Sequence, residues 1–132
     1  MLAGEFKAVL SGMMLSTGPI CREVAAQFAG YMEVKHCLLT NNWTNATVGC
    51  LLSLGIGPGD EVIIPSLTFS ATANAIEAVG AKPVLVDVDP QTKLMDIRQA
   101  LVAVTGHTKA VMPVHLYGQM VDMVELRSMI PA

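Results

Sequence analysis

Short apolar runs alternate with patterns of helical spacing along most of this chain, and this alternation constrains its fold more than any other feature. The apolar runs are rich in β-branched residues and lie at 61–64, 84–86 and 109–114. Helical patterns follow each run, over residues 69–76, 97–104 and 123–130. Strands that alternate with helices form parallel sheets, and strands covered on both faces are continuously apolar. The sequence therefore predicts an α/β fold of three layers, α/β/α, with a mostly parallel sheet.

Local signals predict where several elements begin and end. Pro19 is suited to the first position of a helix, and Gly55 and Gly80 are suited to helix ends. Asp96 with Gln99, and Asp122 with Glu125, have the spacing of helix-capping pairs. The other expectations are an irregular or marginally helical start over residues 1–17, a helical face formed by Ile20, Val24, Phe28 and Tyr31, a short strand over 36–40, a polar turn over 41–44 and a helix over 46–54.

The length of 132 residues is suited to one domain with a modest core. We expect a single partial domain, with an N-terminal irregular or helical arm over 1–35 and βα units over 36–132. Charged residues make up 14% of the chain, against roughly 25% in an average soluble domain. So little charge predicts that much of the surface is covered by further protein.

Composition also excludes several classes of protein. The 52% of hydrophobic residues argues against disorder, and 8 basic against 11 acidic residues argues against nucleic-acid binding. No uncharged stretch reaches the ~20 apolar residues of a membrane span, and the N-terminus does not resemble a targeting peptide. Cys21, Cys37 and Cys50 have no metal-binding spacing, so we expect reduced, mostly buried thiols in a cytoplasmic protein without a metal.

Ligands of open parallel sheets bind beyond the carboxyl ends of the strands. Four loops lie there in the predicted fold, over 40–44, 65–69, 87–90 and 113–119. The segment 42–45 opens a helix after an apolar run, so it is either an ordinary N-cap turn, which spacing alone favours, or a phosphate site.

The other three loops each allow a structural and a functional interpretation. Phe69 is either a core aromatic, favoured by residue type alone, or a ring that faces a planar ligand. His115 and Tyr117 follow a strand, and a lone histidine there is more often a structural hydrogen-bonding group than a catalyst. Asp87 and Asp89 are expected to form caps or an Asp-Pro turn.

These loops resemble the DegT/StrS-type sugar aminotransferases, which use pyridoxal phosphate (PLP) and have the aspartate-aminotransferase fold, PLP fold type I. Three ordered blocks carry the resemblance, over 57–74, 80–90 and 108–118, with Asp122 following them. Upstream, residues 15–19 and 28–31 also fit. The resemblance covers nearly the whole chain and implies the N-terminal part of the family's large domain.

The resemblance implies cofactor-binding roles for Trp43, Thr44, Asn45 and Phe69. The family's phosphate-binding segment usually has the sequence Ser-Gly-Thr-Ala-Ala, and residues 42–46 here are Asn-Trp-Thr-Asn-Ala. Thr44 keeps the family residue, whereas Trp43 and Asn45 replace small ones. Phe69 matches the aromatic residue that stacks on the cofactor ring. His115 and Tyr117 match a segment that lines the cleft, and no catalytic role is assigned to any residue.

The family's Schiff-base lysine and the aspartate that pairs with the pyridine nitrogen have no counterpart here. None of the five lysines lies in a segment that resembles the Schiff-base motif; they are Lys7, Lys35, Lys82, Lys93 and Lys109. We therefore expect the N-terminal, truncated part of an aminotransferase for keto sugar nucleotides, inactive alone. The alternatives are a PLP-dependent sugar dehydratase and a non-catalytic α/β binding or assembly module. Exposed apolar surface further predicts a homo-oligomer, most simply a dimer.

Overall fold

The computed structural model describes residues 7, 10–12, 14 and 17–129. The chain forms two compact units, Met1–Asn41 and Asn42–Ala132. The irregular start expected over residues 1–17 lies largely outside the described residues, as does Ile130 of the last helical pattern.

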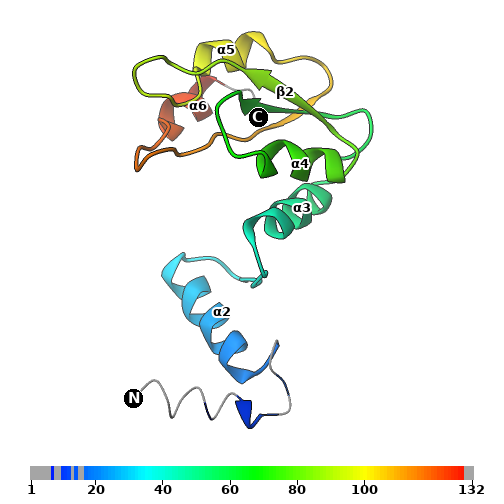
Figure 1. Ribbon diagram of the computed structural model, residues 1–132, viewed down its shortest axis with the longest axis vertical. Coiled ribbons are helices and arrows are strands. Elements are labelled where there is room, and N and C mark those ends of the chain that lie inside the picture. The colour runs from blue at the N-terminus through cyan, green and yellow to red at the C-terminus, as the bar shows by residue number, and fades with distance from the viewer. Residues whose placement is uncertain (1–6, 8–9, 13, 15–16, 130–132) are drawn as a thin grey trace. The chain divides into compact units, whose positions relative to one another are not determined.

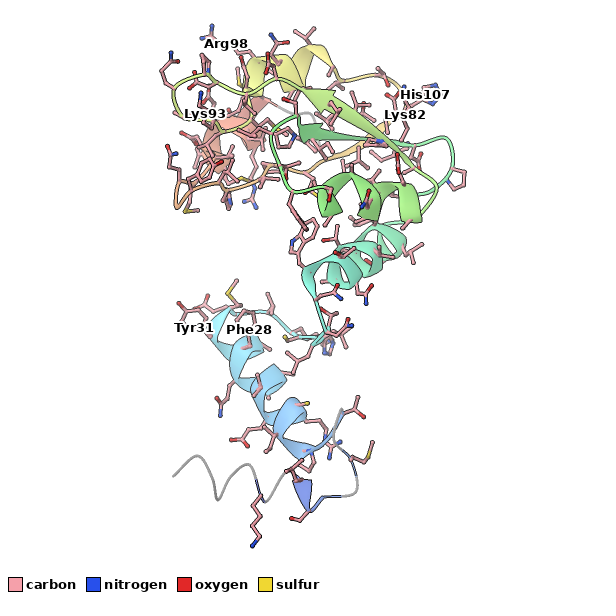
Figure 2. The ribbon with its side chains drawn as sticks, in the orientation of Figure 1. Phe28, Tyr31, Lys82, Lys93, Arg98 and His107 are labelled. Atoms are coloured by element: carbon pink, nitrogen blue, oxygen red, sulfur yellow. The ribbon has the colours of Figure 1, made fainter. Side chains whose placement is uncertain are left out.

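The first unit contains helix α2 (Pro19–Tyr31), which begins where the sequence predicts. Gly18 is its N-cap residue, and proline occupies the start of the first turn, where no backbone N–H is needed. The predicted apolar face is largely exposed within this unit: its residues are Ile20, Val24, Phe28 and Tyr31, with exposed fractions of 45–82%. Figure 2 shows Phe28 and Tyr31 near the C-terminal end of the helix.

The strand predicted over residues 36–40 is wrong. The backbone there has no helical or strand structure, and Leu38 is exposed. A strand needs a neighbour for its N–H and C=O groups, and within the described residues the three strands of the sheet pair only with one another. An apolar run of five residues in the sequence supplies no such neighbour.

The second unit contains the predicted parallel sheet. Strand β1 (Glu61–Pro65) lies in the centre, between β2 (Lys82–Val86) and β3 (Thr108–Val111). Both pairings are parallel; Glu61 is opposite Lys82 on one side and Thr108 on the other. The strand order requires crossovers, and the helices provide them.

Helices cover both faces of this sheet, as Figure 1 shows. On one side lie α3 (Trp43–Ser53) and α4 (Ala71–Ala78); on the other lie α5 (Ile97–Val102) and α6 (Met123–Met129). Neighbouring residues of β1 point to opposite faces, so Val62 and Ile64 join the cluster of α3 and α4, whereas Ile63 joins Ala100 of α5. All three β1 side chains are fully buried. The three-layer α/β/α prediction is therefore confirmed.

Capping side chains fix the helix starts as the sequence predicts. Asp96 Oδ1 accepts hydrogen bonds from the N–H groups of Arg98 and Gln99, and Asp122 Oδ1 accepts from Val124 and Glu125. Gly80, at the end of α4, has φ +79°, and a Cβ added there would lie 3.0 Å from Cγ of Pro58. Only glycine fits this turn between α4 and β2 without strain.

The outer strands and the cysteines are less buried than predicted. Strand β3 ends at Val111, three residues before the end of the predicted apolar run. Leu85 is exposed on β2, which is an edge strand of the sheet. No disulfide joins the three cysteines; Cys50 is exposed and Cys21 and Cys37 are half-buried, so mostly buried thiols were a wrong prediction. Cys50 lies on α3 beside the stripe that Thr47 and Leu51 bury, and therefore outside the core.

None of the helices in the described residues is both long and apolar enough for a bilayer crossing. No three His, Cys, Asp or Glu side chains in that part of the chain are grouped so that they could hold a metal ion.

Candidate functional site

An open cleft of about 600 Å³ lies at the carboxyl end of the sheet. Three segments far apart in the sequence form it: the start of α3, the loop between β1 and α4, and the segment after β3. Its lining is mainly apolar; the residues are Asn42, Trp43, Thr44, Thr68, Phe69, Ala71, Thr72, Pro113, Val114, His115 and Leu116. Its volume is within the ~300–1,000 Å³ typical of small-molecule sites.

The N-terminus of α3 forms one wall of the cleft. Asn42 is the N-cap residue, and its Oδ1 accepts a hydrogen bond of 2.9 Å from the N–H of Asn45. The predicted N-cap turn is thus confirmed. The first intrahelical bond runs from the N–H of Ala46 to the carbonyl of Asn42, so the N–H groups of Trp43 and Thr44 precede it. Such groups and the positive end of the helix dipole favour an anion.

Phe69 lies at the rim of the cleft and is not a core residue. Its side chain is 78% exposed, and it precedes α4, which begins at Ala71. The interpretation as a core aromatic, favoured by residue type alone, is therefore wrong. Strand β1 ends at Pro65, before this residue, and Phe69 is not part of the cluster that contains Ile64 and Ile76.

Two threonines that line the cleft were missed by the sequence analysis. Thr68 Oγ1 and Thr72 Oγ1 are 2.9 Å apart, and Thr72 is buried. The spacing of four residues at the start of a helical pattern was the signal available. Their hydrogen bond holds the loop that carries Phe69 against the first turn of α4.

His115 lines the same cleft from the segment that follows β3. Its Nδ1 accepts a hydrogen bond of 3.1 Å from the backbone N–H of Val121. A structural hydrogen-bonding role, the interpretation that the sequence favoured, is confirmed by this bond. Tyr117 is not among the lining residues and occupies a left-handed turn with φ 55°.

The loop over 87–90 does not take part in the cleft. Asp89 accepts hydrogen bonds from the N–H groups of Gln91 and Thr92, which makes it a turn-forming residue as predicted. Its hydrogen bonds from the Thr92 backbone and side chain lower the pKa of its carboxyl below the ordinary value. Asp89 lines a separate pocket of about 340 Å³ beside α5.

The structure brings together most of the residues that the sequence singled out as cofactor-binding. Trp43, Thr44 and Phe69 all line the cleft, whereas Asn45 is not among the lining residues. Trp43 is the only tryptophan of the chain and is half-exposed there.

The opposite end of the sheet is held by paired polar groups. Glu61, the first residue of β1, accepts hydrogen bonds from Lys82 Nζ at 2.9 Å and from Thr105 Oγ1 at 2.6 Å. These bonds, that from Thr105 first, lower the pKa of the Glu61 carboxyl, and nearby His107 acts in the same direction. Figure 2 shows Lys82 and His107 together at this end.

None of the lysines is among the residues that line the cleft. Lys82 is at the amino end of the sheet, and Lys93 donates to the carbonyl of Pro90 in its own turn. Within the described part of the chain, the lining therefore offers rings, hydroxyls, an imidazole and backbone N–H groups, and no amine.

Comparison with solved structures identifies the class of this fold. The chain matches S. venezuelae DesV with a TM-score of 0.86 and 40% identity, covering 97% of this chain and 36% of that one. It matches NtdA of Bacillus subtilis, solved with the bound cofactor PMP (pyridoxamine phosphate), with a TM-score of 0.81 and 40% identity, covering 86% of this chain and 26% of that one. The fold is that of the PLP fold type I aminotransferases.

The family follows from the sequence. The model of the DegT/DnrJ/EryC1/StrS aminotransferase family matches residues 2–131, and the chain belongs to this family. GDP-perosamine synthase of Caulobacter vibrioides is 51% identical over 108 residues, which are 82% of this chain and 29% of that protein. UDP-2-acetamido-2-deoxy-3-oxo-D-glucuronate aminotransferase of Pseudomonas aeruginosa is 44% identical over 105 residues, 80% of this chain and 29% of that protein.

The chain thus spans about 30% of the length of these curated relatives. Its cleft fits two parts of the family's cofactor. An exposed aromatic ring suits the face of a pyridine ring, and the first turn of α3 suits a phosphate. The lining holds no amine for covalent attachment.

Proposed function

We propose that this chain supplies the phosphate- and ring-binding part of the PLP site of an aminotransferase that acts on keto sugars carried by nucleotides. The observation that supports it most is the open cleft at the carboxyl end of the sheet. Its lining combines the first turn of α3 with the exposed ring of Phe69. Family membership supports the reaction class.

Each part of the lining has a role in this proposal. Backbone N–H groups of Trp43 and Thr44, with the Thr44 hydroxyl, bind the phosphate. Phe69 stacks on the pyridine ring, and the Thr68–Thr72 hydrogen bond keeps the Phe69 loop in place. Asn45 contributes through the helix start, because its N–H is bonded to the Asn42 cap.

PLP, when bound, withdraws electrons from the amine carbon, which allows an amino group to be exchanged with a keto group. The residues of this cleft bind and orient the ring for that chemistry. They do not include a general base for the transfer or an amine for attachment, so we expect these 132 residues alone not to catalyse it.

The names of the relatives support the substrate class. GDP-perosamine synthase and the UDP-2-acetamido-2-deoxy-3-oxo-D-glucuronate aminotransferase both handle sugars linked to a nucleoside diphosphate. A dehydration on the same cofactor is the alternative within PLP chemistry. In a longer enzyme that also contains the Schiff-base lysine, glutamate and a keto sugar nucleotide would yield an amino sugar only under the aminotransferase proposal.

Binding can be tested with pyridoxamine phosphate, because it has no aldehyde and cannot label surface lysines. We expect equilibrium dialysis to find one saturable site on the 132-residue chain. Quenching of Trp43 fluorescence should follow the same curve, since Trp43 is the only tryptophan and lines the cleft. Dephosphorylated pyridoxamine is the matched control and should bind far more weakly. Equal binding of both compounds, or none, would overturn the proposal.

The absence of a cleft amine has its own test. After treatment with PLP and borohydride, peptide mapping should find only scattered, partial labelling of lysines. One lysine labelled in every molecule would contradict the expected inactivity. With glutamate and a keto sugar nucleotide, mass spectrometry should likewise detect no amino sugar from this chain alone.

A second candidate function is a non-catalytic module that assembles with a further copy. The exposed apolar face of α2 favours it, since surfaces of this kind commonly mark interfaces. Sedimentation at increasing concentration should show a monomer–dimer equilibrium that Phe28→Lys weakens. A monomer at every concentration would exclude this module.

A further inference from the structure

The segment that follows β3 is folded back on itself by a tight turn. The N–H of Gln119 donates to the carbonyl of Leu116 at 3.0 Å, and both central residues, Tyr117 and Gly118, have positive φ values of 55° and 76°. These features define a type I′ turn. A tyrosine in the left-handed region is strained, so surrounding bonds must hold the turn.

His115 supplies one of these bonds across the turn. Its Nδ1 accepts from the N–H of Val121 at 3.1 Å, and Val121 is buried. Gln119 supplies another, because its Nε2 donates to the carbonyl of Thr92 at 3.1 Å. The loop is thus tied both to itself and to the turn that precedes α5.

This hydrogen bond determines the tautomer of His115. A ring nitrogen that accepts from an N–H carries no proton, so the neutral imidazole carries its proton on Nε2. His115 is exposed and lines the cleft, and no described residue bonds to its Nε2. The ring therefore offers a hydrogen-bond donor to a ligand in the cleft, with its orientation fixed from behind.

We propose that Val121 orients His115 as an Nε2–H donor, and that His115 thereby binds an acceptor oxygen of the ligand that occupies the cleft. The imidazole is a binding residue, and the backbone of Val121 acts through it. This inference rests on the proposed function only for the identity of the ligand, a pyridoxamine or pyridoxal phosphate. The tautomer and the loop contact stand on this chain alone.

Two variants distinguish the role of Nδ1, which accepts from Val121, from that of Nε2, which donates to the ligand. In His115→Asn the side-chain oxygen takes the place of Nδ1 and can accept from Val121, but no donor replaces Nε2. In His115→Gln the longer amide reaches the place of Nε2 with a donor, but the acceptor for Val121 is lost. His107→Asn, at the opposite end of the sheet, is the matched control.

Three readouts decide the proposal. The imidazole ¹⁵N spectrum of the ligand-free chain at neutral pH should show an unprotonated Nδ1 and a protonated Nε2. Amide exchange at Val121 should stay slow in His115→Asn and become about tenfold faster in His115→Gln. Affinity for pyridoxamine phosphate should fall about tenfold in His115→Asn, the effect of one lost hydrogen bond to a charged acceptor. It should stay unchanged in His107→Asn.

Contrary results are equally specific. A proton on Nδ1 in the ligand-free chain would overturn the orientation by Val121. Unchanged affinity in His115→Asn would overturn the binding role. If the wild-type chain does not bind pyridoxamine phosphate, the binding role fails together with the proposed function, whereas the spectrum and the exchange rates still decide the orientation.

Discussion

The two ends of the central strand β1 differ in how their polar and aromatic side chains are used. At the amino end, Glu61 is bonded to Lys82 and Thr105, which joins β1 to β2 and to the segment before β3. At the carboxyl end, Phe69 and Trp43 stay exposed around an open cleft. At one end of β1, polar side chains thus form hydrogen bonds with one another. At the other end, exposed side chains line a cleft that a ligand can enter. Under the proposed function, the amino end of the sheet is structural and the carboxyl end binds the ligand.

The largest expected effect is on stability and comes from the middle residue of β1. Ile63 is fully buried at the centre of β1, so Ile63→Ala should cost roughly 2–5 kcal/mol of the free energy of unfolding. Urea denaturation followed by circular dichroism measures it. Leu85→Ala, on the exposed side of edge strand β2, is the control and should change stability by less than about 0.5 kcal/mol. Equal losses would mean that the sheet is not the core of this unit.

Phe69→Ala tests the carboxyl end alone. Removal of the exposed ring should weaken pyridoxamine phosphate binding about tenfold, close to the ~1.5 kcal/mol of a good aromatic contact. Thermal unfolding should hardly change, because the ring is 78% exposed. Phe69→Tyr keeps the ring and should bind normally. A variant that binds normally but unfolds early would make Phe69 a structural residue and remove the contrast between the two ends.

Asn42→Ala tests the helix start on which the phosphate role depends. Loss of the bond from Asn45 N–H to the Asn42 side chain should cost about 1 kcal/mol of stability, as for other N-caps. Asn42→Ser retains a side-chain oxygen acceptor and should restore most of it. Denaturant midpoints of the three proteins give the comparison, and equal midpoints would show that the cap does not hold α3.

Glu61→Gln tests the amino end and should have the smallest effect. The pKa of Glu61 is lowered in the folded chain, so its contribution is present above the unfolded-state pKa and is lost as the pH falls through the folded one. Wild-type stability should therefore decrease on acidification more than that of Glu61→Gln. Glu77→Gln on α4 is the control. Parallel pH profiles for wild type and Glu61→Gln would contradict the role of Glu61, and weaker ligand binding would contradict the separation of the two ends.

The sequence predicted the layers of the fold better than it predicted exposure. Alternating apolar runs and the Asp96 and Asp122 capping signals depend on neighbours in sequence, and they yielded the parallel sheet and the helix starts. The apolar run over 36–40 failed as a strand because pairing requires a partner that local pattern cannot supply. The prediction of Phe69 as a core residue was wrong for a related reason. The burial of the Phe69 ring depends on the direction in which the chain leaves β1, which local sequence does not determine.

The site was predicted in part. The resemblance to the family implied cofactor roles for Trp43, Thr44, Asn45 and Phe69, and all of these except Asn45 line the cleft. Position after a strand placed His115 at the same edge of the sheet. The contact between His115 and Val121 could not be predicted, because it depends on a turn with a left-handed tyrosine that no residue preference indicates. The loop over 87–90 follows a strand in the same way, yet Asp89 bonds within its own turn and lies outside the cleft.

A titration of the ¹⁵N-labelled chain with pyridoxamine phosphate tests most directly which end of the sheet binds. We predict saturable shifts that are largest for the amides of Trp43, Thr44, Phe69 and His115, all of which belong to the cleft lining. The amides of the amino end, such as Glu61, should not move. Shifts that are largest at Glu61 and its neighbours, or no saturable shift at any residue, would contradict a cofactor site at the carboxyl end.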